Sequence, residues 1–364
     1  MIYLDYQATT PLAPEALAAM LPWLEQQHAN PHSAHAPGRA AKAAVEVARD
    51  AVAALLPTGG SLSFTSGATE AINWAIKGIG PGGIVTLATE HAATLDTVEA
   101  LARAGRRVTV LPVDADGLVD LARARAAIGP GTALVTAMLV NNEIGVIQPV
   151  AELAAIAHEA GALFLCDAVQ GYGRIAVPDG CDLIAISAHK IHGPKGIGGL
   201  WIRDGVTIAP LLHGGGQEAA GRSGTLSPAL CAGFGAAARL AQDWHEDDAT
   251  HVNELWALAT ERLGVGWTIN GSVEQRYHGN LNVRRDGLDV NRLTSELRDI
   301  AFSAGSACAS GSGRPSHVLR AIGLSDAQAR SSIRLGFGRY TTQEELIIAI
   351  DRINTAAAAQ RIAA

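Results

Sequence analysis

The chain has 364 residues, 48% of them hydrophobic, and carries a formal net charge of -7 at pH 7. Its length fits about two domains, and its negative charge argues against binding nucleic acid over a broad surface. No run approaches the roughly 18 apolar residues of a membrane span, and the opening "MIYLDYQATT" lacks the basic and apolar regions of a signal peptide. We therefore expect a soluble, cytoplasmic protein.

Short apolar runs alternate with helical stretches over the first two thirds of the chain. Helices are predicted at 92–104 and 150–160. Strands are predicted at 61–65, 83–88, 107–113, 133–140, 162–168, 182–187 and 198–203. Continuous apolar strands separated by helices indicate an α/β fold with a largely parallel sheet, covered on both faces. Such sheets bind ligands at the carboxyl ends of their strands.

The pattern changes after about residue 247. A long, charged helix is predicted at 243–263. Two further strands at 279–285 and 332–338 mix with helices at 289–299 and 343–358. This order of elements indicates a second, smaller α+β domain.

Lys190 follows the predicted strand 182–187 within one turn, where a sheet presents groups to a ligand. A lysine with a lowered pKa at such a place could form a Schiff base with a carbonyl cofactor. A surface lysine on a loop is the alternative, and Lys195 in "GPKG" is a local competitor. The other two lysines, Lys42 and Lys77, lie in helical surroundings.

Asp167 ends an otherwise apolar strand, and a buried carboxylate needs a partner. The ring nitrogen of pyridoxal phosphate would be one, because a facing carboxylate keeps that nitrogen protonated. A helix cap or an internal salt bridge is the alternative. Asp167 precedes Lys190 by one helix and one strand, so both side chains could reach one cleft.

The stretch "FTSGATEAIN" predicts a strand that ends at Thr65, a Ser-Gly turn and a helix that begins near Ala68. Free backbone N–H groups and the positive end of the helix dipole then meet at one point, which is an anion site. Thr69 could add a hydroxyl group. Many strand–helix turns look like this one without binding phosphate.

Three more polar residues are candidates at strand ends or within a strand. His91 in "ATEHAAT" could stack on a cofactor ring or move protons, or could simply begin a helix. Asn142 could bond to a cofactor oxygen or shape its turn. Arg334, in the apolar "SSIRLGFG", must be paired if buried, either with a substrate carboxylate or with an internal acid.

Cys308 stands among small residues in "SAGSACASGSGRP", residues 303–315. It is one of four cysteines, with Cys166, Cys181 and Cys231, and no C-x-x-C pair indicates a metal or dithiol site. A cysteine in a Gly/Ser segment could move between two places. It is either an ordinary loop thiol or a mobile nucleophile.

Taken together, these residues indicate a pyridoxal-phosphate enzyme with an accessory thiol. The chain resembles the cysteine desulfurases, pyridoxal-phosphate enzymes of the class V aminotransferase type, over nearly its whole length. The matching motifs are "YLDYQATTP", "NPHSAH", "FTSGATEAIN", "TEHAAT", "VNNEIGVIQP", "DAVQ", "SAHKIHGPKGIG", "HGGGQEAAGRSGT", "SAGSACAS" and "SSIRLGFGR". Their number and length make chance similarity negligible.

The resemblance implies an aspartate-aminotransferase-like fold (fold type I), with a mostly parallel seven-stranded sheet and a smaller α+β domain. Residues 14–247 would form the large domain. Residues 1–13 and 248–364 would form the small domain, which carries the cysteine loop at about 303–315. It also implies a homodimer with active sites near the interface.

The resemblance also implies the site residues. Pyridoxal 5'-phosphate would be bound covalently to Lys190, Cys308 would be the nucleophile, and no metal ligands are expected. The cofactor would be held by Ala68, Thr69, His91, Asn142, Asp167, Gln170, Ser187 and His189, with Thr225 reaching in from the other subunit. Asn30 and Arg334 would bind the substrate carboxylate.

The implied reaction removes sulfur from L-cysteine, giving L-alanine and a persulfide on Cys308. The sulfur would pass to an acceptor protein, possibly an iron–sulfur scaffold, for iron–sulfur cluster or other sulfur-containing cofactor or tRNA synthesis. No nucleic-acid or membrane partner is expected. A selenocysteine lyase or another class V aminotransferase is the alternative, and a non-catalytic sulfur carrier fits the intact motifs less well.

The chain departs from the family pattern at three places. Ala188 stands where glycine is common, and Val169 where threonine is common. Neither change removes a residue with an implied role. The sequence ends at Ala364, one helix after 332–338, short of the tail with which other members dock a scaffold protein. We therefore do not expect docking through such a tail.

Overall fold

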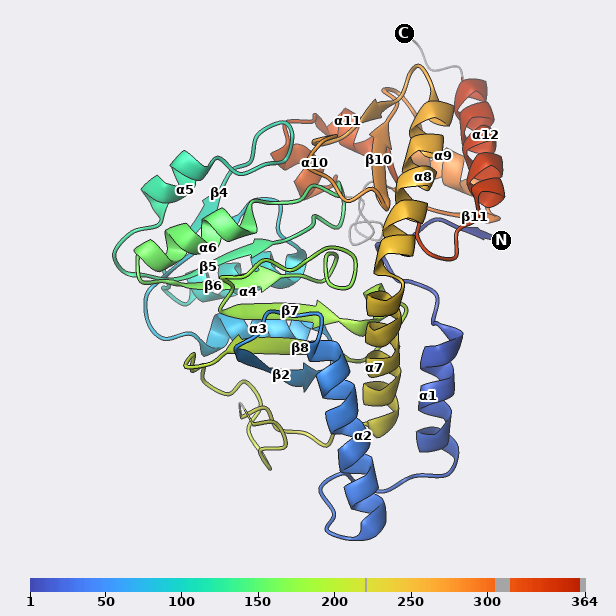
Figure 1. The fold of residues 1–364 in the computed structure, drawn as a ribbon. Coiled ribbons are helices and arrows are strands. Elements are labelled where there is room, and N and C mark those ends of the chain that lie inside the picture. Colours follow the sequence, from blue (N-terminus) through green and yellow to red (C-terminus); the bar gives the residue numbers. More distant parts are fainter. Residues whose placement is uncertain (220, 305–314, 361–364) are drawn as a thin grey trace.

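A computed structural model describes residues 1–219, 221–304 and 315–360. It contains a seven-stranded sheet whose strands lie in the order β2-β8-β7-β6-β5-β3-β4 (Figure 1). Its strands are β2 (Gly60–Thr65), β3 (Gly83–Leu87), β4 (Val108–Leu111), β5 (Thr132–Met138), β6 (Leu163–Asp167), β7 (Leu183–Ser187) and β8 (Gly198–Arg203). The predicted α/β fold and its seven strands are confirmed.

The large sheet is mixed, because one strand runs against its neighbours. Strands β4, β3, β5, β6 and β7 pair in parallel, whereas β8 pairs antiparallel with both β7 and β2. The parallel strands β3 and β7 are buried along their whole length. This explains why they read as continuous apolar runs in the sequence.

Helices cover both faces of the large sheet. They are α1 (Pro14–Glu25), α2 (Ala36–Ala53), α3 (Ala68–Gly78), α4 (Ala92–Arg103), α5 (Leu121–Ala127), α6 (Val150–Glu159) and α7 (Pro228–Asp243). Apolar residues of α3 and α4 pack on one face of the sheet, and those of α2, α6 and α7 pack on the other. The predicted helices 92–104 and 150–160 are thus confirmed within one residue.

A smaller set of elements follows the large sheet. Its helices are α8 (His245–Leu263), α9 (Val290–Glu296), α10 (His317–Ala321), α11 (Asp326–Arg330) and α12 (Gln343–Ala359). A four-stranded sheet has the order β12-β13-β10-β9, with β9 (Thr268–Ile269), β10 (Asn280–Arg284), β12 (Ser303–Ala304) and β13 (Ser332–Gly336). Figure 1 shows α8, α9 and α12 grouped beside this sheet.

The start of the chain lies with these late elements. Strand β1 (Ile2–Tyr3) pairs in parallel with β11 (Ile300–Ala301), and Leu4 is fully buried in the apolar core formed by residues 255–357. The N-terminal strand thus contacts the second set of elements, and the division into domains stays a prediction. The predicted helix 289–299 ends early, at Glu296, because residues 300–301 extend to pair with β1.

The long charged helix begins two residues later than predicted. Residue 243 ends α7, and Trp244, with ψ near 14°, separates it from α8. Figure 1 shows the two helices following one another end to end. In the part of the chain that the structure describes, no helix has the length and apolar character needed to cross a membrane.

Candidate active site

A cavity of about 430 Å³ lies where β5, β6 and β7 end and α3 and α4 begin. Ten of the predicted site residues line it: Ala68, Thr69, His91, Asn142, Asp167, Gln170, Ser187, His189, Lys190 and Arg334. These residues are spread over more than 260 positions of the sequence. The carboxyl ends of neighbouring strands bring most of them to one place.

Lys190 ends a single 3₁₀ turn, Ala188–Lys190, directly after β7. Its Nζ donates to the backbone oxygen of Gln7 and, at 2.8 Å, to that of Ala8. The competing Lys195 lines the same cavity but is exposed. Lys190 is therefore the lysine that the fold holds at the strand ends.

Gln7 and Ala8 were not predicted to contact Lys190. Gln7 is 2% exposed, and its Nε2 donates to the Gly279 backbone oxygen at 2.7 Å. Both residues lie in the motif "YLDYQATTP", which does not by itself predict that their carbonyl oxygens bind a lysine.

Asp167 is the last residue of β6 and is 3% exposed. Its Oδ1 accepts from the Val169 backbone N–H at 3.0 Å. Burial raises the pKa of the Asp167 carboxyl, while His91, that N–H and Lys190 lower it. Burial disfavours the charged form of this carboxyl group, so a cationic partner in the same cavity would stabilise it.

His91 caps the N-terminus of α4, as its place before a helix predicted. Its Nδ1 accepts from the Ala93 backbone N–H at 3.1 Å, so in the neutral ring the proton is on Nε2. Burial lowers the pKa of His91, and the neighbouring Lys190 and His317 lower it further. A neutral imidazole can either accept or relay a proton near pH 7.

Glu90, next to His91, was missed by the sequence analysis. Its side chain is fully buried, and Oε1 accepts from the Met138 backbone N–H at 2.9 Å, while Oε2 has no partner among the described residues. Burial raises the pKa of Glu90 well above its usual value, and Asp167 raises it further. The buried carboxyl groups of Glu90 and Asp167 therefore differ in their surroundings, because Lys190 and His91 favour the charged form of Asp167.

The N-terminus of α3 opens into the cavity through Ser66, Gly67, Ala68 and Thr69. Among the described residues no side chain caps this helix, and the Ser66 N–H donates to Glu70 Oε2 at 2.7 Å. The first amides of the helix therefore remain available to an anion.

His189 lies on the cavity wall, and its Nδ1 contacts Thr9 Oγ1 at 3.1 Å. Burial, with help from Lys190, Lys195 and Arg174, lowers the pKa of His189 to about 4. The ring is thus neutral at pH 7 and can donate or accept a hydrogen bond. The same cations make this wall favourable for an anion.

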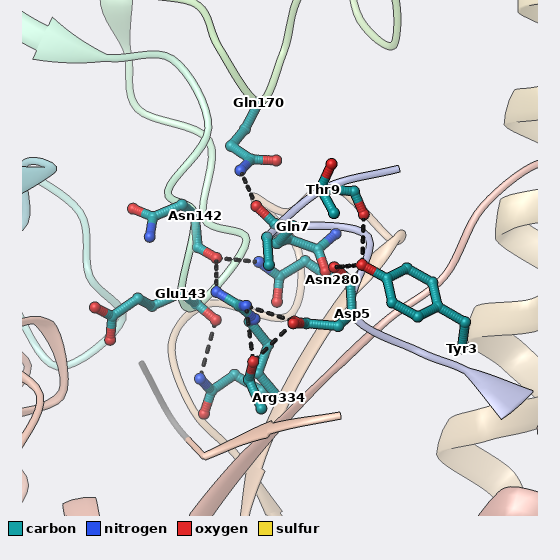
Figure 2. Close-up of polar contacts among 12 residues, drawn as sticks. Tyr3, Asp5, Gln7, Thr9, Asn142, Glu143, Gln170, Asn280 and Arg334 are labelled. Atoms are coloured by element: carbon teal, nitrogen blue, oxygen red, sulfur yellow. Dashed lines mark hydrogen bonds and ion pairs between the residues drawn. The ribbon is translucent and has the colours of Figure 1, made fainter. Parts of the chain in front are cut away.

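Gln170 has a fixed amide orientation. Its Nε2 donates to the Gln7 backbone oxygen at 2.9 Å, and its Oε1 accepts from Arg174 Nη1 at 3.0 Å. One N–H of the amide is left for another acceptor. Figure 2 shows Gln170 pointing toward the N-terminal segment that carries Gln7.

Arg334 lies on β13 and is 1% exposed. Its Nη2 donates to Asp5 Oδ1 at 2.7 Å, and its Nη1 donates to the Asn142 backbone oxygen at 2.9 Å (Figure 2). The internal acid and the substrate carboxylate, the two partners considered for this arginine, are therefore both compatible with its position. An internal acid is present, and Arg334 also lines the cavity.

Two predicted residues do not line the cavity. Asn30 is exposed between α1 and α2, where its Oδ1 accepts from the His32 backbone N–H. Thr225 is exposed just before α7, in a loop held by the Arg222–Glu70 ion pair. Thr225 was predicted to serve the other subunit, which a single chain does not test. Both assignments stay predictions.

Cys308 lies outside the described residues, but described residues on both sides of it contact residues that bond to cavity residues or adjoin them in the sequence. On one side, Ser303 Oγ donates to Asp5 Oδ1 at 2.8 Å. On the other, Ser316 Oγ donates to Glu143 Oε2, and His317 Nε2 contacts the Glu90 backbone oxygen at 2.9 Å. Ser303 and Ser316 are therefore both held by neighbours of cavity residues.

The side chains around the cavity fit pyridoxal phosphate. A helix N-terminus without a side-chain cap among the described residues suits the phosphate, a buried carboxylate suits the ring nitrogen, and a lysine lines the same cavity. Among the described residues, no group of three or more His, Cys, Asp or Glu side chains is arranged to hold a metal ion.

Comparison with known proteins gives the same assignment. The model of the aminotransferase class-V family matches residues 2–348. Cysteine desulfurase IscS of Rickettsia bellii (strain OSU 85-389) is 44% identical over 97% of this chain and 90% of its own. A solved NifS-like protein has a TM-score of 0.90 and 33% identity over 97% of this chain and 98% of its own.

A third relative is a solved structure described as SspA in complex with cysteine. It has a TM-score of 0.84 and 35% identity over 94% of this chain and all of its own. The similarities cover nearly the whole chain and include the cavity. The chain therefore belongs to the class-V aminotransferase family and, within that family, to the cysteine desulfurases.

Proposed function

We propose that this cysteine desulfurase transfers the sulfur of L-cysteine to the thiol of Cys308. The Cβ–S bond of the substrate breaks, an S–S bond forms on Cys308, and a proton replaces sulfur on Cβ to give L-alanine. The products balance the reactants without an added oxidant or reductant. The observation that carries the proposal is the meeting of Lys190, Asp167 and His91 in one cavity.

Pyridoxal 5'-phosphate, when bound, supplies an electron sink that stabilises negative charge on the substrate carbon next to it. We expect the α3 N-terminus at Ala68 and Thr69, with Ser187 and His189, to hold its phosphate. Asp167 would pair with its ring nitrogen, and Asn142 and Gln170 would bond to its ring substituents. The uncapped helix and the free amide N–H of Gln170 support these roles.

Lys190 and His91 are proposed to move protons. Lys190 would carry the cofactor and, once released, take the proton from the substrate Cα, because its amine lies on the cavity wall next to Asp167 and His91. His91 is neutral at pH 7 and keeps its Nε2–H, so it can relay a proton between substrate and thiol.

Cys308 must act as a thiolate, since the thiolate and not the thiol is the nucleophile. The contacts of Ser303 with Asp5 and of Ser316 with Glu143 support its access to the cavity, because they tie both flanks of its segment to cavity neighbours. Its Gly/Ser-rich surroundings would allow it to deliver sulfur elsewhere.

Several further assignments belong to this proposal. They are a homodimer, an acceptor protein for the sulfur, possibly an iron–sulfur scaffold, and a cytoplasmic location. The division into a large domain (14–247) and a small one (1–13 with 248–364) is supported by the separate apolar core of residues 255–357 with Leu4. L-cysteine as substrate is supported by the relative described in complex with cysteine.

The test is to incubate the pyridoxal-phosphate form with L-cysteine and locate the added sulfur atom by mass spectrometry. We expect one persulfide on the peptide that carries Cys308 and one alanine released per sulfur transferred. The Cys308→Ala variant should keep the absorbance of the bound cofactor but form no persulfide.

The matched control is Cys231→Ala, a buried cysteine on α7 that should leave the reaction unchanged. Alanine release at the wild-type rate by Cys308→Ala would contradict the assigned nucleophile. Parallel reactions with selenocysteine would show whether the alternative lyase activity predominates.

A further inference from the structure

Asp5, Ser303 and Arg334 form a closed set of contacts beside the cavity, called here the Asp5 cluster. Asp5 Oδ1 accepts from Arg334 Nη2 at 2.7 Å and from Ser303 Oγ at 2.8 Å. Arg334 Nη2 also donates to Ser303 Oγ at 3.3 Å. Figure 2 shows the guanidinium of Arg334 between Asp5 on one side and Asn142 on the other.

Strand pairing fixes the Asp5 cluster. Ser303 and Arg334 are directly opposite each other in the antiparallel pair β12–β13. Asp5 forms a parallel bridge with Gly336, two residues beyond Arg334 on β13. The backbone register of these strands therefore brings together side chains from three distant parts of the sequence.

The donors of Arg334 can be counted. Both Nη2 hydrogens are used by Asp5 and Ser303, and one Nη1 hydrogen is used by the Asn142 backbone oxygen. Nε has no partner among the described residues. Every two-bond edge of a guanidinium includes Nη2, which is already used, so the Nε–H and one Nη1–H remain as two separate donors on different edges.

We propose that Asp5 is a positioning residue, which fixes the Arg334 guanidinium in the orientation that binds the carboxylate of the amino-acid substrate. This inference rests on the proposed function, in which Arg334 binds that carboxylate. Asp5 does not touch the substrate. It acts by restricting an arginine that could otherwise turn its planar guanidinium, and the N–H donors that remain on it, away from the substrate carboxylate.

The structure also distinguishes this arrangement from a surface ion pair. The Arg334 side chain is 1% exposed and that of Asp5 20%, whereas the Asp299–Arg352 pair is exposed on both sides. A buried, hydrogen-bonded ion pair loses much more when one partner is removed than an exposed pair does. Asp299 therefore provides a matched control.

The experiment compares two ligands on the cofactor-loaded enzyme: L-alanine, which has a carboxylate, and cysteamine, which has none. Binding is followed by the absorbance change of the bound cofactor. For Asp5→Ala we expect about 10- to 100-fold weaker L-alanine binding and a matching rise in KM for L-cysteine. Cysteamine binding and kcat should change by less than about 3-fold.

Asp5→Asn should lie between wild type and Asp5→Ala, because its amide oxygen accepts the same hydrogen bonds without the charge. It also provides a readout if Asp5→Ala does not fold. Asp299→Ala should behave as wild type. Equal losses of L-alanine and cysteamine binding in both Asp5 variants would overturn the inference, since general damage to the site would explain them.

Arg334→Ala separates this inference from the proposed function. If Arg334→Ala leaves L-alanine binding unchanged, the carboxylate role of Arg334 is wrong and the inference falls with it. If Arg334→Ala weakens L-alanine binding and Asp5→Ala does not, only the role of Asp5 is wrong.

Discussion

The two sides of the cavity are built in different ways. On one side, Lys190, Asp167 and His91 follow the ends of neighbouring strands of the large sheet or begin the next helix. On the other, Arg334 and Asp5 come from β13 and the N-terminal segment, more than 320 residues apart. Local sequence determines the first side, and long-range strand pairing determines the second.

This difference also affects how each side manages its charges. Asp167 is buried and accepts a hydrogen bond from the Val169 backbone N–H, and His91 and Lys190 favour its charged form against the effect of burial. Arg334 is buried with an acid of its own, Asp5. We infer that the large-sheet side supplies the chemistry and the second side supplies a fixed frame for the substrate.

The largest expected effect tests the large-sheet side. Lys190→Ala should remove covalently bound cofactor and lower the rate of alanine release by at least about 10²- to 10⁴-fold, because the proposed base is lost. Reduction with borohydride followed by peptide mass spectrometry should find the cofactor on Lys190 in the wild type. Lys195→Ala is the matched control, and cofactor found on Lys195 would contradict the assignment.

The next effect compares the two buried carboxyl groups. Asp167→Asn keeps the shape but removes the charge, and we expect a rate loss of the order of 10²-fold or more. Glu90→Gln should change the rate by less than about 5-fold, because burial raises the pKa of Glu90 well above its usual value and so favours its neutral form, which glutamine resembles. A large loss in Glu90→Gln with little loss in Asp167→Asn would reverse their roles.

The smallest effect concerns stability on the second side, at Glu143. Burial raises the pKa of Glu143 from 4.5 to about 7, against the contact with Ser316 and the charge of Arg334. The folded chain then binds this proton more tightly than the unfolded chain. The free energy of unfolding should therefore fall as pH rises from about 4.5 to about 7, by up to about 3 kcal/mol.

Denaturant unfolding of wild type and Glu143→Gln at pH 5 and pH 8 measures this effect. The variant should lose the Glu143 part of the pH dependence and gain stability relative to wild type at pH 8. Glu152→Gln, an exposed position on α6, is the control. An identical pH dependence in Glu143→Gln and wild type would contradict the raised pKa.

Much of the large sheet and its side of the site could be predicted from the sequence. Most strands of the large sheet are apolar runs, and Thr65, Asp167 and Ser187 end their strands as predicted. Apolar periodicity and helix starts depend on neighbouring residues, so strands and helices can be predicted from them without knowledge of tertiary contacts. The helix starts at Ala68 and His91 followed from the same reasoning.

The contacts made by the N-terminal segment could not be predicted. Nothing local indicates that the carbonyls of Gln7 and Ala8 would hold Lys190, or that Asp5 would pair with Arg334. Every residue has a backbone oxygen, so the sequence does not indicate which of them will bind a side chain. Strands β1 and β11 have two residues each, which is too short for a periodic pattern. The burial of Glu90 could not be predicted either, because its motif already offered His91 as the candidate polar residue.

The pairing of β1 with β11 has a consequence for the order of events during synthesis. Ile2 leaves the ribosome long before Ile300, its partner, has been translated. By then every strand of the large sheet, which ends at Arg203, is already available to fold. The strands that pair with β1 and carry Arg334 are added only after that. The nascent chain can thus complete its larger sheet well before it acquires a working active site.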